Sequence, residues 1–424
     1  MMFDVIINKS ELKGKLSAFP SKSMLHRTII AAGLSKGKSV IKPFAYSDDI
    51  SATLNGIKAL GATYKVEGNV LYVYGVENYR YTKDVIHVFD SASTLRFFIP
   101  IMSLLNQPVT FSMDKSLQKR PLTTYEMIFK DGLVKKNEFV TISKPIQSGD
   151  FYLEDALSSQ YITGLLFTLP LLKESSKIYI ENLGSKAYID LTIDVLDAFG
   201  IHIEETDYGY LIPGNQRYKA KNIKVDGDYS QSAFFLCAGL FHPYVEVDGL
   251  NLNSKQADYK IVQYIKQMNG KIIFNEEGFT TFKSSLKGID ININQSPDLA
   301  PILAFTLSLS QGKSSLYNGS RLRLKESDRI ASTVSVLNAL GAEIEVDGDT
   351  MIIHPIEAYK GGITLDAHKD HRIVMMLAVA GSILDKPITI KNAHYINKSY
   401  PTFFEDYSKL GGCVEIIKRG EDHD

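Results

Sequence analysis

The segment Arg321-Leu322-Arg323-Leu324-Lys325-Glu326-Ser327-Asp328-Arg329 places several cations beside the start of an amphipathic helix. Apolar residues follow at helical spacing from Ile330 to Leu340, and Gly341 closes the pattern. We expect the helix to begin near Lys325, which would place Lys325 and Arg329 one turn apart on one face. Backbone N–H groups at a helix start carry partial positive charge, so a cation there typically loses roughly 0.3–1 kcal/mol. An anionic ligand reverses that sign, because N–H groups and cations can then bind the same oxygens.

Two interpretations of this segment are open. In the simpler one, Glu326 and Asp328 neutralise the cations on a solvated helix face, which is the usual arrangement for a single charged segment. In the other, the segment is part of an anion-binding site. Recurrence of the pattern elsewhere in the chain favours the second interpretation.

The glycine that closes this helix belongs to a series whose members lie about 70 residues apart, a spacing typical of repeated supersecondary units. A glycine just past an amphipathic run predicts a left-handed helix C-cap. Short alternating apolar segments, such as residues 62–66 and 69–73, follow most copies and predict paired strands. The six copies are Leu60-Gly61, Asp131-Gly132, Phe199-Gly200, Asn269-Gly270, Leu340-Gly341 and Leu410-Gly411.

A second helix family has a similar period, with serine or aspartate at most of its starts and mostly apolar residues afterwards. These helices begin near Ser21, Ser91, Ser158, Ser230, Pro297 and Asp370. Each repeat therefore has two helices and several strands, of βαβαββ type. Six repeats exceed one core, so we predict an α/β (α+β) fold with two domains of three repeats, an inside-out barrel with helices inside and sheets outside.

The predicted domain boundaries follow the breaks at Pro20 and at Asp226-Gly227-Asp228. Residues 21–226 form one predicted domain, and residues 1–20 with 227–424 form the other. In this division the first strand, within residues 5–12, belongs to the C-terminal half.

Composition restricts the function classes. The 424-residue chain is 44% hydrophobic with a formal net charge of -1, which argues against a general nucleic-acid or membrane binder. Two cysteines and nine scattered histidines show no zinc or disulfide pattern, so no metal is expected. No signal peptide or membrane-length apolar run is present, and we expect a cytoplasmic protein.

Helix starts and neighbouring loops carry an unusual set of cationic and hydroxyl side chains. If the helix starts of the two domains face each other, these groups suit a small polyanion with phosphate or carboxylate groups. Asp298 and Glu326 add carboxylates, although Asp298 taken alone is more simply interpreted as an ordinary helix N-cap. The set comprises Lys22, Ser23, Arg27, Arg96, Arg120, Ser185, Lys186, Tyr188, Lys325, Arg329, Arg372 and Lys398.

Over essentially its whole length, the sequence resembles the 5-enolpyruvylshikimate-3-phosphate (EPSP) synthases of the enolpyruvyl transferase family. In their order and spacing the matching motifs are specific. They are Lys22-Ser23 with Arg27, Ser91-Ala92-Ser93-Thr94-Leu95-Arg96, Lys119-Arg120-Pro121, Ser158-Ser159-Gln160, Ser185-Lys186-Ala187-Tyr188, Asp298, Lys325-Glu326-Ser327-Asp328-Arg329, Asp370-His371-Arg372 and Lys398.

The resemblance implies two domains, each of three βαβαββ units, with the active site in the cleft between them. It also implies transfer of the enolpyruvyl group of phosphoenolpyruvate to the 5-hydroxyl of shikimate 3-phosphate, without metal or cofactor. The expected partners are these two small substrates alone, with no nucleic acid and no membrane, and the chain is expected to be a monomer.

The resemblance further implies a role for each matching residue. Asp298 would take the 5-hydroxyl proton, and either Glu326 or Lys22 would handle protonation of the enol carbon. Arg27 would offer a two-pronged contact to a carboxylate. Shikimate 3-phosphate would be held by Ser23, Arg27, Ser158, Ser159, Gln160, Ser185, Tyr188, Asp298 and Lys325. Phosphoenolpyruvate would be held by Lys22, Ala92, Ser93, Arg120, Arg329, Arg372 and Lys398.

The chain departs from the family pattern at three positions. Ala92 aligns with a glycine whose missing side chain leaves room beside phosphoenolpyruvate, where the herbicide glyphosate binds in the family. Its methyl group therefore predicts poor sensitivity to glyphosate. Ala187 and Arg321 replace a usual proline and asparagine.

Two other functions fit parts of the pattern. A UDP-N-acetylglucosamine enolpyruvyl transferase would share the repeats and the donor site, with Asp114 in the loop that carries its reactive residue, but the segment 185–188 favours the shikimate enzyme. A non-catalytic ring or clamp on nucleic acid would also use repeated units, but near-neutral charge argues against it.

Overall fold

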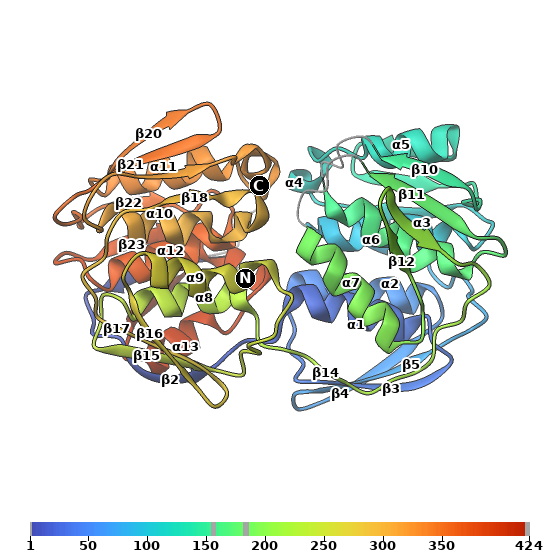
Figure 1. Ribbon diagram of the computed structural model, residues 1–424, viewed down its shortest axis with the longest axis horizontal. Coiled ribbons are helices and arrows are strands. Elements are labelled where there is room, and N and C mark those ends of the chain that lie inside the picture. The colour runs from blue at the N-terminus through green and yellow to red at the C-terminus, as the bar shows by residue number, and fades with distance from the viewer. Residues whose placement is uncertain (1, 154–157, 181–185, 420–424) are drawn as a thin grey trace. The chain divides into compact units, whose positions relative to one another are not determined.

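The computed structural model describes residues 2–153, 158–180 and 186–419, and these residues form two compact units (Figure 1). Unit 1 comprises Met1–Phe19 with Gly227–Asp424, and unit 2 comprises Pro20–Asp226. That residues 21–226 and residues 1–20 with 227–424 act as domains stays a prediction. Among the described residues, no helix has the length and apolar character that a membrane span requires.

The described strands form six four-stranded sheets, three in each unit. In unit 2 the sheets consist of β3 (Gly37–Lys42), β4 (Thr63–Glu67), β5 (Val70–Gly75) and β14 (Ile223–Lys224); of β6 (Ile86–His87), β7 (Val109–Ser112), β8 (Leu133–Lys136) and β9 (Phe139–Ile142); and of β10 (Asp150–Leu153), β11 (Ser176–Ile180), β12 (Glu204–Thr206) and β13 (Gly209–Ile212).

Unit 1 repeats this arrangement. Its sheets consist of β2 (Lys13–Ser17), β15 (Tyr244–Asp248), β16 (Lys271–Asn275) and β17 (Gly278–Phe282); of β18 (Asp290–Asn292), β19 (Ser314–Tyr317), β20 (Glu343–Asp347) and β21 (Thr350–His354); and of β1 (Phe3–Asn8), β22 (Thr364–Asp366), β23 (Ile388–Lys391) and β24 (Cys413–Lys418).

Every sheet combines one parallel pair of strands with two antiparallel pairs. The strands β6 and β7 run parallel on either side of a helix, and β8 and β9 then pair antiparallel. Three sheets include a strand from a distant part of the chain: β1 lies between β23 and β24, β14 joins β3, and β2 joins β15. The chain thus builds six βαβαββ repeats, and the predicted fold class is confirmed.

The helices fall into the two predicted families. Unit 2 contains α1 (Lys22–Gly33), α2 (Asp48–Ala59), α3 (Ala92–Ser103), α4 (Lys115–Gln118), α5 (Thr123–Phe129), α6 (Ser159–Thr168) and α7 (Lys186–Ala198), with 3-10 turns at Lys130–Gly132 and Leu169–Leu171. Unit 1 contains α8 (Tyr229–Ala238), α9 (Lys260–Gln267), α10 (Ala300–Ser308), α11 (Arg329–Ala339), α12 (His371–Gly381) and α13 (Phe403–Lys409), with 3-10 turns at Ala257–Tyr259, Ile293–Gln295, Pro297–Leu299, Ser320–Leu324 and Ala393–Lys398.

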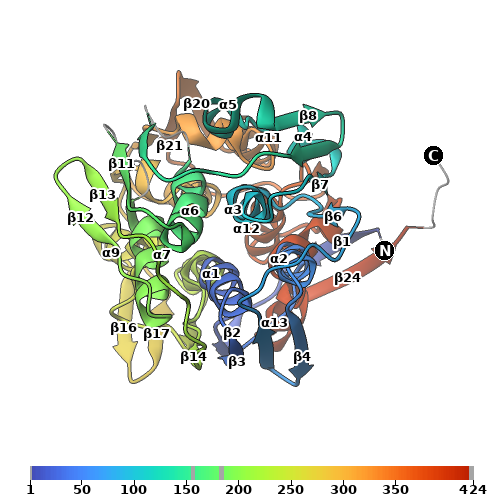
Figure 2. The ribbon, with the colours of Figure 1, turned by 90° about the vertical axis from the view of Figure 1, so that its right-hand side faces the viewer.

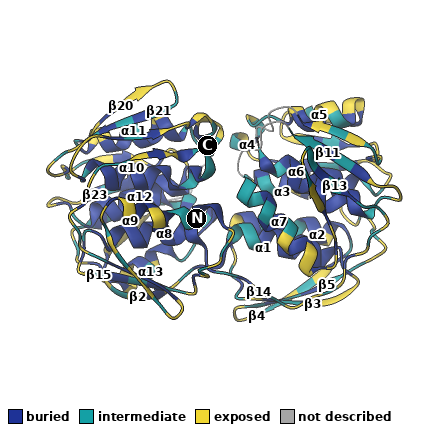
Figure 3. Ribbon diagram, in the orientation of Figure 1, coloured by how far each residue is buried: buried dark blue, intermediate teal, exposed yellow. Residues whose placement is uncertain are grey.

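One family forms the interior of each unit. In Figure 2, α1, α3 and α6 lie within the three sheets of unit 2. In unit 1, α10 and α12 are buried along their whole length, as helices that are apolar on all sides must be. Figure 3 shows the same division, with buried residues on the inner helices and exposed residues along the sheets and loops.

The ends of the helices agree with the sequence pattern at most positions. Side chains of Ser21, Ser91, Ser158 and Asp370 accept hydrogen bonds from backbone N–H groups as N-caps, as predicted. The helix expected near Ser230 begins one residue earlier, at Tyr229, because Asp228 is its cap.

The predicted left-handed glycines are confirmed at four of the six repeats, where Gly61, Gly200, Gly341 and Gly411 have φ between +79° and +101°. The other two repeats reach the left-handed region at a residue before the glycine. Asn269 takes that conformation instead of Gly270, and Lys130 instead of Gly132.

The helix predicted to begin near Lys325 begins at Arg329 instead. A 3-10 turn occupies Ser320–Leu324, Lys325 is extended, and the Asp328 side chain caps α11 by accepting from the Ala331 N–H. The expectation that Lys325 and Arg329 lie one turn apart on one helix is therefore wrong. The periodic apolar residues begin only at Ile330, and the aspartate just before Arg329 is the stronger start signal.

Candidate active site

A carboxylate surrounded by cations lies at the starts of the inner helices of unit 1. Asp298, in the 3-10 turn before α10, accepts from Arg329 Nη1 at 2.7 Å, from Lys325 Nζ at 3.2 Å and from Arg372 Nη2 at 3.3 Å. These residues come from two repeats, with Arg372 in a different repeat from the other three, so only the folded unit brings them together. Asp298 makes no N-cap hydrogen bond, and the N-cap interpretation is wrong.

Arg329 is the centre of this group and is only 1% exposed. Besides Asp298, its guanidinium donates to Glu326 at 2.6 Å and to both oxygens of Asp370 at 2.8 and 3.2 Å. A solvated helix face is therefore the wrong interpretation for Arg329. It does describe Arg323, which is exposed and pairs with Asp328 and Asp349.

The charges around Asp298 decide its protonation state. Burial raises the pKa of the carboxyl group, but the nearby Lys325, Arg372 and Arg329 lower it by more, so that it lies well below its usual value. Asp298 is therefore ionised at neutral pH. While it occupies these cations, however, it is a weak base, because three positive charges stabilise its anionic form.

In unit 2, the start of α1 carries Lys22, whose Nζ donates to Asp49 at 2.7 Å. Both side chains are largely buried, at 17% and 8% exposure. Removing Lys22 would leave the Asp49 carboxylate without this cation in a poorly solvated position. Lys22 should therefore contribute to stability through this ion pair, although a cation at a helix start is unfavourable by itself.

Arg27, one turn further along α1, makes several hydrogen bonds within the protein. Its guanidinium donates to the Ser23 carbonyl at 2.7 Å, to Thr192 Oγ1 at 2.8 Å and to the Tyr188 carbonyl at 3.0 Å. Burial lowers its pKa to about 10, so it stays charged at neutral pH. The predicted two-pronged contact with a ligand carboxylate is not how this guanidinium is arranged here, since these bonds fix Arg27 between α1 and α7.

The starts of α3 and α6 meet in a chain of polar contacts. The Gln160 side chain donates to Ser93 Oγ at 2.9 Å and accepts from Arg96 Nη1 at 2.7 Å. Arg96 also donates to the Pro121 carbonyl at 3.0 Å. Gln160 and Ser93, which the family resemblance assigns to two different substrates, are thus hydrogen-bonded to each other.

The remaining predicted residues occupy the following places. Ala92 is the first residue of α3 and is buried. Ser158 caps α6 and Ser159 is its first residue, so both hydroxyls lie at a helix start. Tyr188 lies in the first turn of α7, Arg120 follows α4, and Lys398 is buried at the end of a 3-10 turn. Ser185 lies outside the described residues.

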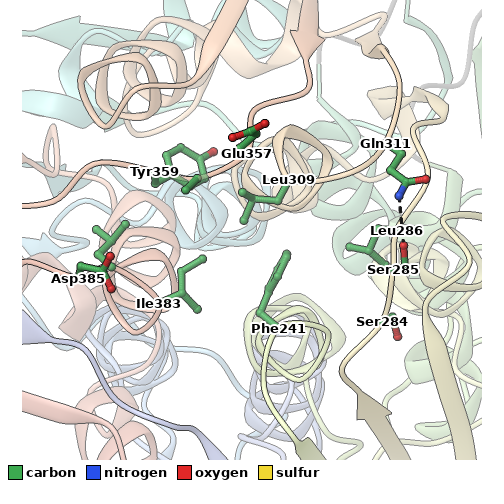
Figure 4. A pocket seen from close by; sticks show the side chains of 12 residues that line it. Phe241, Ser284, Ser285, Leu286, Leu309, Gln311, Glu357, Tyr359, Ile383 and Asp385 are labelled. Atoms are coloured by element: carbon green, nitrogen blue, oxygen red, sulfur yellow. Dashed lines mark hydrogen bonds between the residues drawn. The ribbon is translucent and has the colours of Figure 1, made fainter.

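A cavity of about 380 Å³ lies elsewhere in unit 1 (Figure 4). Phe241, Leu309 and Ile383 line it, each just past the C-terminal end of an inner helix, so it lies at the ends opposite the charged starts. Its charged lining residues are the acids Glu357 and Asp385. Helix C-termini and carboxylates repel anions, and this cavity does not suit phosphorylated carboxylates.

The cations around Asp298 in unit 1 and the polar helix starts of unit 2 have the chemistry of an enzyme that acts on anions. The relatives of the chain identify the enzyme family. The family model of EPSP synthase (3-phosphoshikimate 1-carboxyvinyltransferase) matches residues 6–407. The chain belongs to the EPSP synthase family. This confirms the family resemblance that the sequence motifs indicated.

Related sequences and structures agree with the EPSP synthase family. A 3-phosphoshikimate 1-carboxyvinyltransferase of Clostridium perfringens is 43% identical over 427 residues, covering 98% of this chain and 100% of the relative. One from Clostridium kluyveri is 41% identical over 418 residues, covering 97% of this chain and 98% of the relative.

Solved structures show the fold alone, since their sequences are distant. An EPSP synthase of Acinetobacter baumannii has a TM-score of 0.83 at 22% identity, covering 98% of this chain and 99% of its own. The enolpyruvyl transferase NikO of Streptomyces tendae has a TM-score of 0.77 at 15% identity, covering 99% of both chains. Membership of the EPSP synthase family at full length argues against the two rival functions.

Sequence reasoning missed several partners of the EPSP synthase motif residues. Asp49 pairs with Lys22, and Asp370 binds Arg329 as well as capping α12. An acidic residue in the first turn of α2 was a detectable signal for Asp49, since such residues stabilise helix starts. Asp258, whose partner Ser230 contacts Arg372, carries no recognisable signal in the sequence.

Proposed function

We propose that the chain transfers the enolpyruvyl group of phosphoenolpyruvate to the 5-hydroxyl of shikimate 3-phosphate. The products are 5-enolpyruvylshikimate 3-phosphate and inorganic phosphate, formed by addition and then elimination. Family membership supports this reaction, and the observation that carries it is the Asp298 carboxylate held by Lys325, Arg329 and Arg372. Both substrates are phosphorylated carboxylates that need such cations.

The proposed binding residues are those that the family resemblance assigns to each substrate. Shikimate 3-phosphate would be held by Ser23, Arg27, Ser158, Ser159, Gln160, Ser185, Tyr188, Asp298 and Lys325. Phosphoenolpyruvate would be held by Lys22, Ala92, Ser93, Arg120, Arg329, Arg372 and Lys398. Of these, Arg27 acts mainly by fixing Tyr188 and Ser23, because its donors already bind their carbonyls. No cofactor is part of the proposal, and the chain is proposed to act as a monomer.

The ion pairs of Asp298 support a role that depends on substrate. Anionic substrate groups compete with Asp298 for Lys325, Arg329 and Arg372, and each cation they take removes a charge that lowers the Asp298 pKa. The carboxylate then becomes a better base for the 5-hydroxyl proton. Glu326 or Lys22 would protonate the enol carbon, and the cations would stabilise the charge-rich tetrahedral intermediate.

Phosphate release tests the proposed reaction directly. The purified chain should release inorganic phosphate from phosphoenolpyruvate only when shikimate 3-phosphate is also present, with one enolpyruvyl product formed per phosphate. Replacing shikimate 3-phosphate with UDP-N-acetylglucosamine is the matched control for the nearest rival. Phosphate release with the sugar nucleotide alone would contradict the proposal.

Lys22→Ala is expected to reduce product formation by at least about 100-fold, since it removes a positioned cation from the donor site. It should also lower the free energy of unfolding, because the largely buried Asp49 loses its ion pair. Lys36→Ala is a suitable control, since Lys36 pairs with Glu77 on the surface of the same unit. Steady-state kinetics and urea denaturation measure the two effects, and normal turnover by Lys22→Ala would count against its role.

Ala92→Gly is expected to increase glyphosate sensitivity, because it removes a methyl group at the buried first residue of α3. The inhibition constant should fall by about tenfold or more, while the KM for phosphoenolpyruvate changes less. Competition kinetics against phosphoenolpyruvate measure both quantities. Equally tight inhibition of both proteins would show that the Ala92 methyl group does not restrict the site.

A further inference from the structure

Asp258 is a buried carboxyl group that the proposed reaction leaves without a role. It lies in the 3-10 turn Ala257–Tyr259 before α9 and is 1% exposed. The Ser230 hydroxyl, at the start of α8, donates to its Oδ2. Its Oδ1 is buried and has no hydrogen-bond partner among the described residues. A buried acid in such a place needs a physical explanation.

The contacts of Ser230 connect Asp258 to the candidate active site. The Ser230 backbone carbonyl accepts from Arg372 Nη1 at 2.9 Å, and Arg372 Nη2 donates to Asp298 at 3.3 Å. Ser230, at the start of α8, thus links Asp258 to the Arg372 guanidinium. That guanidinium in turn donates to Asp298, the proposed base. All four residues belong to unit 1.

We infer that Asp258 is a positioning residue for the enolpyruvyl transfer: through Ser230 it fixes the Arg372 guanidinium against Asp298. This inference rests on the proposed function and deepens it, because Arg372 is proposed to bind phosphoenolpyruvate. Without the hydroxyl-to-carboxyl bond, the start of α8 and the Ser230 carbonyl lose a restraint. Small displacements of a binding group are costly in catalysis, since the reacting groups must meet in one geometry.

The charge on Asp258 matters as well as its position. Burial raises the pKa of its carboxyl group to about 7, and the nearby Asp298 carboxylate and, more weakly, Asp228 also raise it. Arg372 and the hydrogen bond from Ser230 lower the pKa. Tyr264, on α9, is a further titratable group that interacts with it. Below about pH 7 Asp258 is therefore neutral, and the positive charge of Arg372 remains available to Asp298 and to substrate.

The sign of the pH effect follows from this. As pH rises through about 7, Asp258 becomes an anion that competes with Asp298 and phosphoenolpyruvate for Arg372. The activity of the wild type should therefore decline over that range. The amide introduced by Asp258→Asn cannot ionise, yet its oxygen still accepts from Ser230, so this variant should lack the decline.

Three variants test the inference by kinetics. Asp258→Ala and Ser230→Ala should each raise the KM for phosphoenolpyruvate or lower kcat/KM for it by about tenfold, with little change in the KM for shikimate 3-phosphate. The double variant should be no worse than either single one, because both changes break the same link. Asp258→Asn should stay within about twofold of the wild type at pH 6.5.

A matched control is available in the same unit. Ser315 Oγ donates to Asp290 at 2.7 Å at an exposed edge between β18 and β19. Asp290→Ala and Ser315→Ala remove the same kind of bond away from Arg372 and should leave the kinetics unchanged. Circular dichroism and thermal melting establish that each variant is folded. If Asp258→Ala does not fold, Asp258→Asn and Ser230→Ala still carry the test.

Several results would overturn the inference. One is a kinetic defect in Asp258→Asn at pH 6.5 as large as that of Asp258→Ala, and another is additivity of the two single substitutions. An unchanged pH profile in Asp258→Asn, or a wild type without a decline near pH 7, would also contradict it. Wild-type phosphate release in the same assay separates the two proposals: an inactive wild type counts against the proposed function, whereas an active wild type with an equally active Asp258→Ala counts against Asp258.

Discussion

Asp298→Asn is expected to lower kcat by about 100-fold to 10,000-fold, the range typical of a lost general base. The amide keeps the size of the carboxyl group but cannot accept a proton at neutral pH. It also releases Lys325, Arg329 and Arg372 from a competing anion. The affinity for phosphoenolpyruvate should therefore be retained or increased while turnover is lost.

Two measurements separate these effects. Isothermal titration with phosphoenolpyruvate in the presence of shikimate 3-phosphate measures binding, and phosphate release measures turnover. Asp385→Asn is the control, because Asp385 is an exposed acid of unit 1 that pairs with Lys9. Near-normal turnover by Asp298→Asn rules out a base role, and a parallel loss of binding and turnover would indicate that Asp298 acts in binding alone.

Arg329→Met is expected to cause the largest loss of stability, with loss of activity. Burial lowers the pKa of this guanidinium, but its contacts with Asp370, Glu326 and Asp298 raise the pKa by more, because the three carboxylates stabilise its charge. Breaking a buried ion pair from one side costs about 3–5 kcal/mol, since the partner charges stay buried. Arg329→Lys should be intermediate, because an ammonium group cannot reproduce the planar fork.

A neighbouring arginine provides the control for Arg329. Arg323 also makes two ion pairs, with Asp328 and Asp349, but its side chain and both partners are over one third exposed. Arg323→Met should therefore change the free energy of unfolding by at most about 1 kcal/mol. Urea denaturation of both variants measures the difference. Equal losses for Arg323→Met and Arg329→Met would show that burial of the Arg329 network does not contribute to stability.

Much of the architecture was predictable because its signals are local. A glycine after an amphipathic run ends a helix through its own backbone freedom, and Gly61, Gly200, Gly341 and Gly411 do so in the structure. Ser21, Ser91 and Ser158 cap helices through hydroxyl groups that reach the next turn. The helix start that was predicted wrongly, near Lys325, lies at Arg329 instead, because Asp328 caps the helix.

The pairing of the site residues was less predictable. Lys22 and Asp49, or Arg329 and Asp370, are far apart in the chain, and no spacing rule connects them. The hydrogen bonds of Arg27 within the protein were equally unpredictable from the sequence. Thr192 and the Tyr188 carbonyl reach its guanidinium only after α7 packs on α1.

By itself, the sequence determined the repeat, the fold class and the identity of the cationic helix starts, since helix caps, apolar periodicity and residue type depend on neighbours along the chain. Only the tertiary structure decided which charges meet. It placed Asp298 among three cations and Asp258 behind Arg372, and burial together with these neighbours then set their opposite pKa shifts. The physical reason is that Coulomb and desolvation energies depend on distances through space, which packing alone sets.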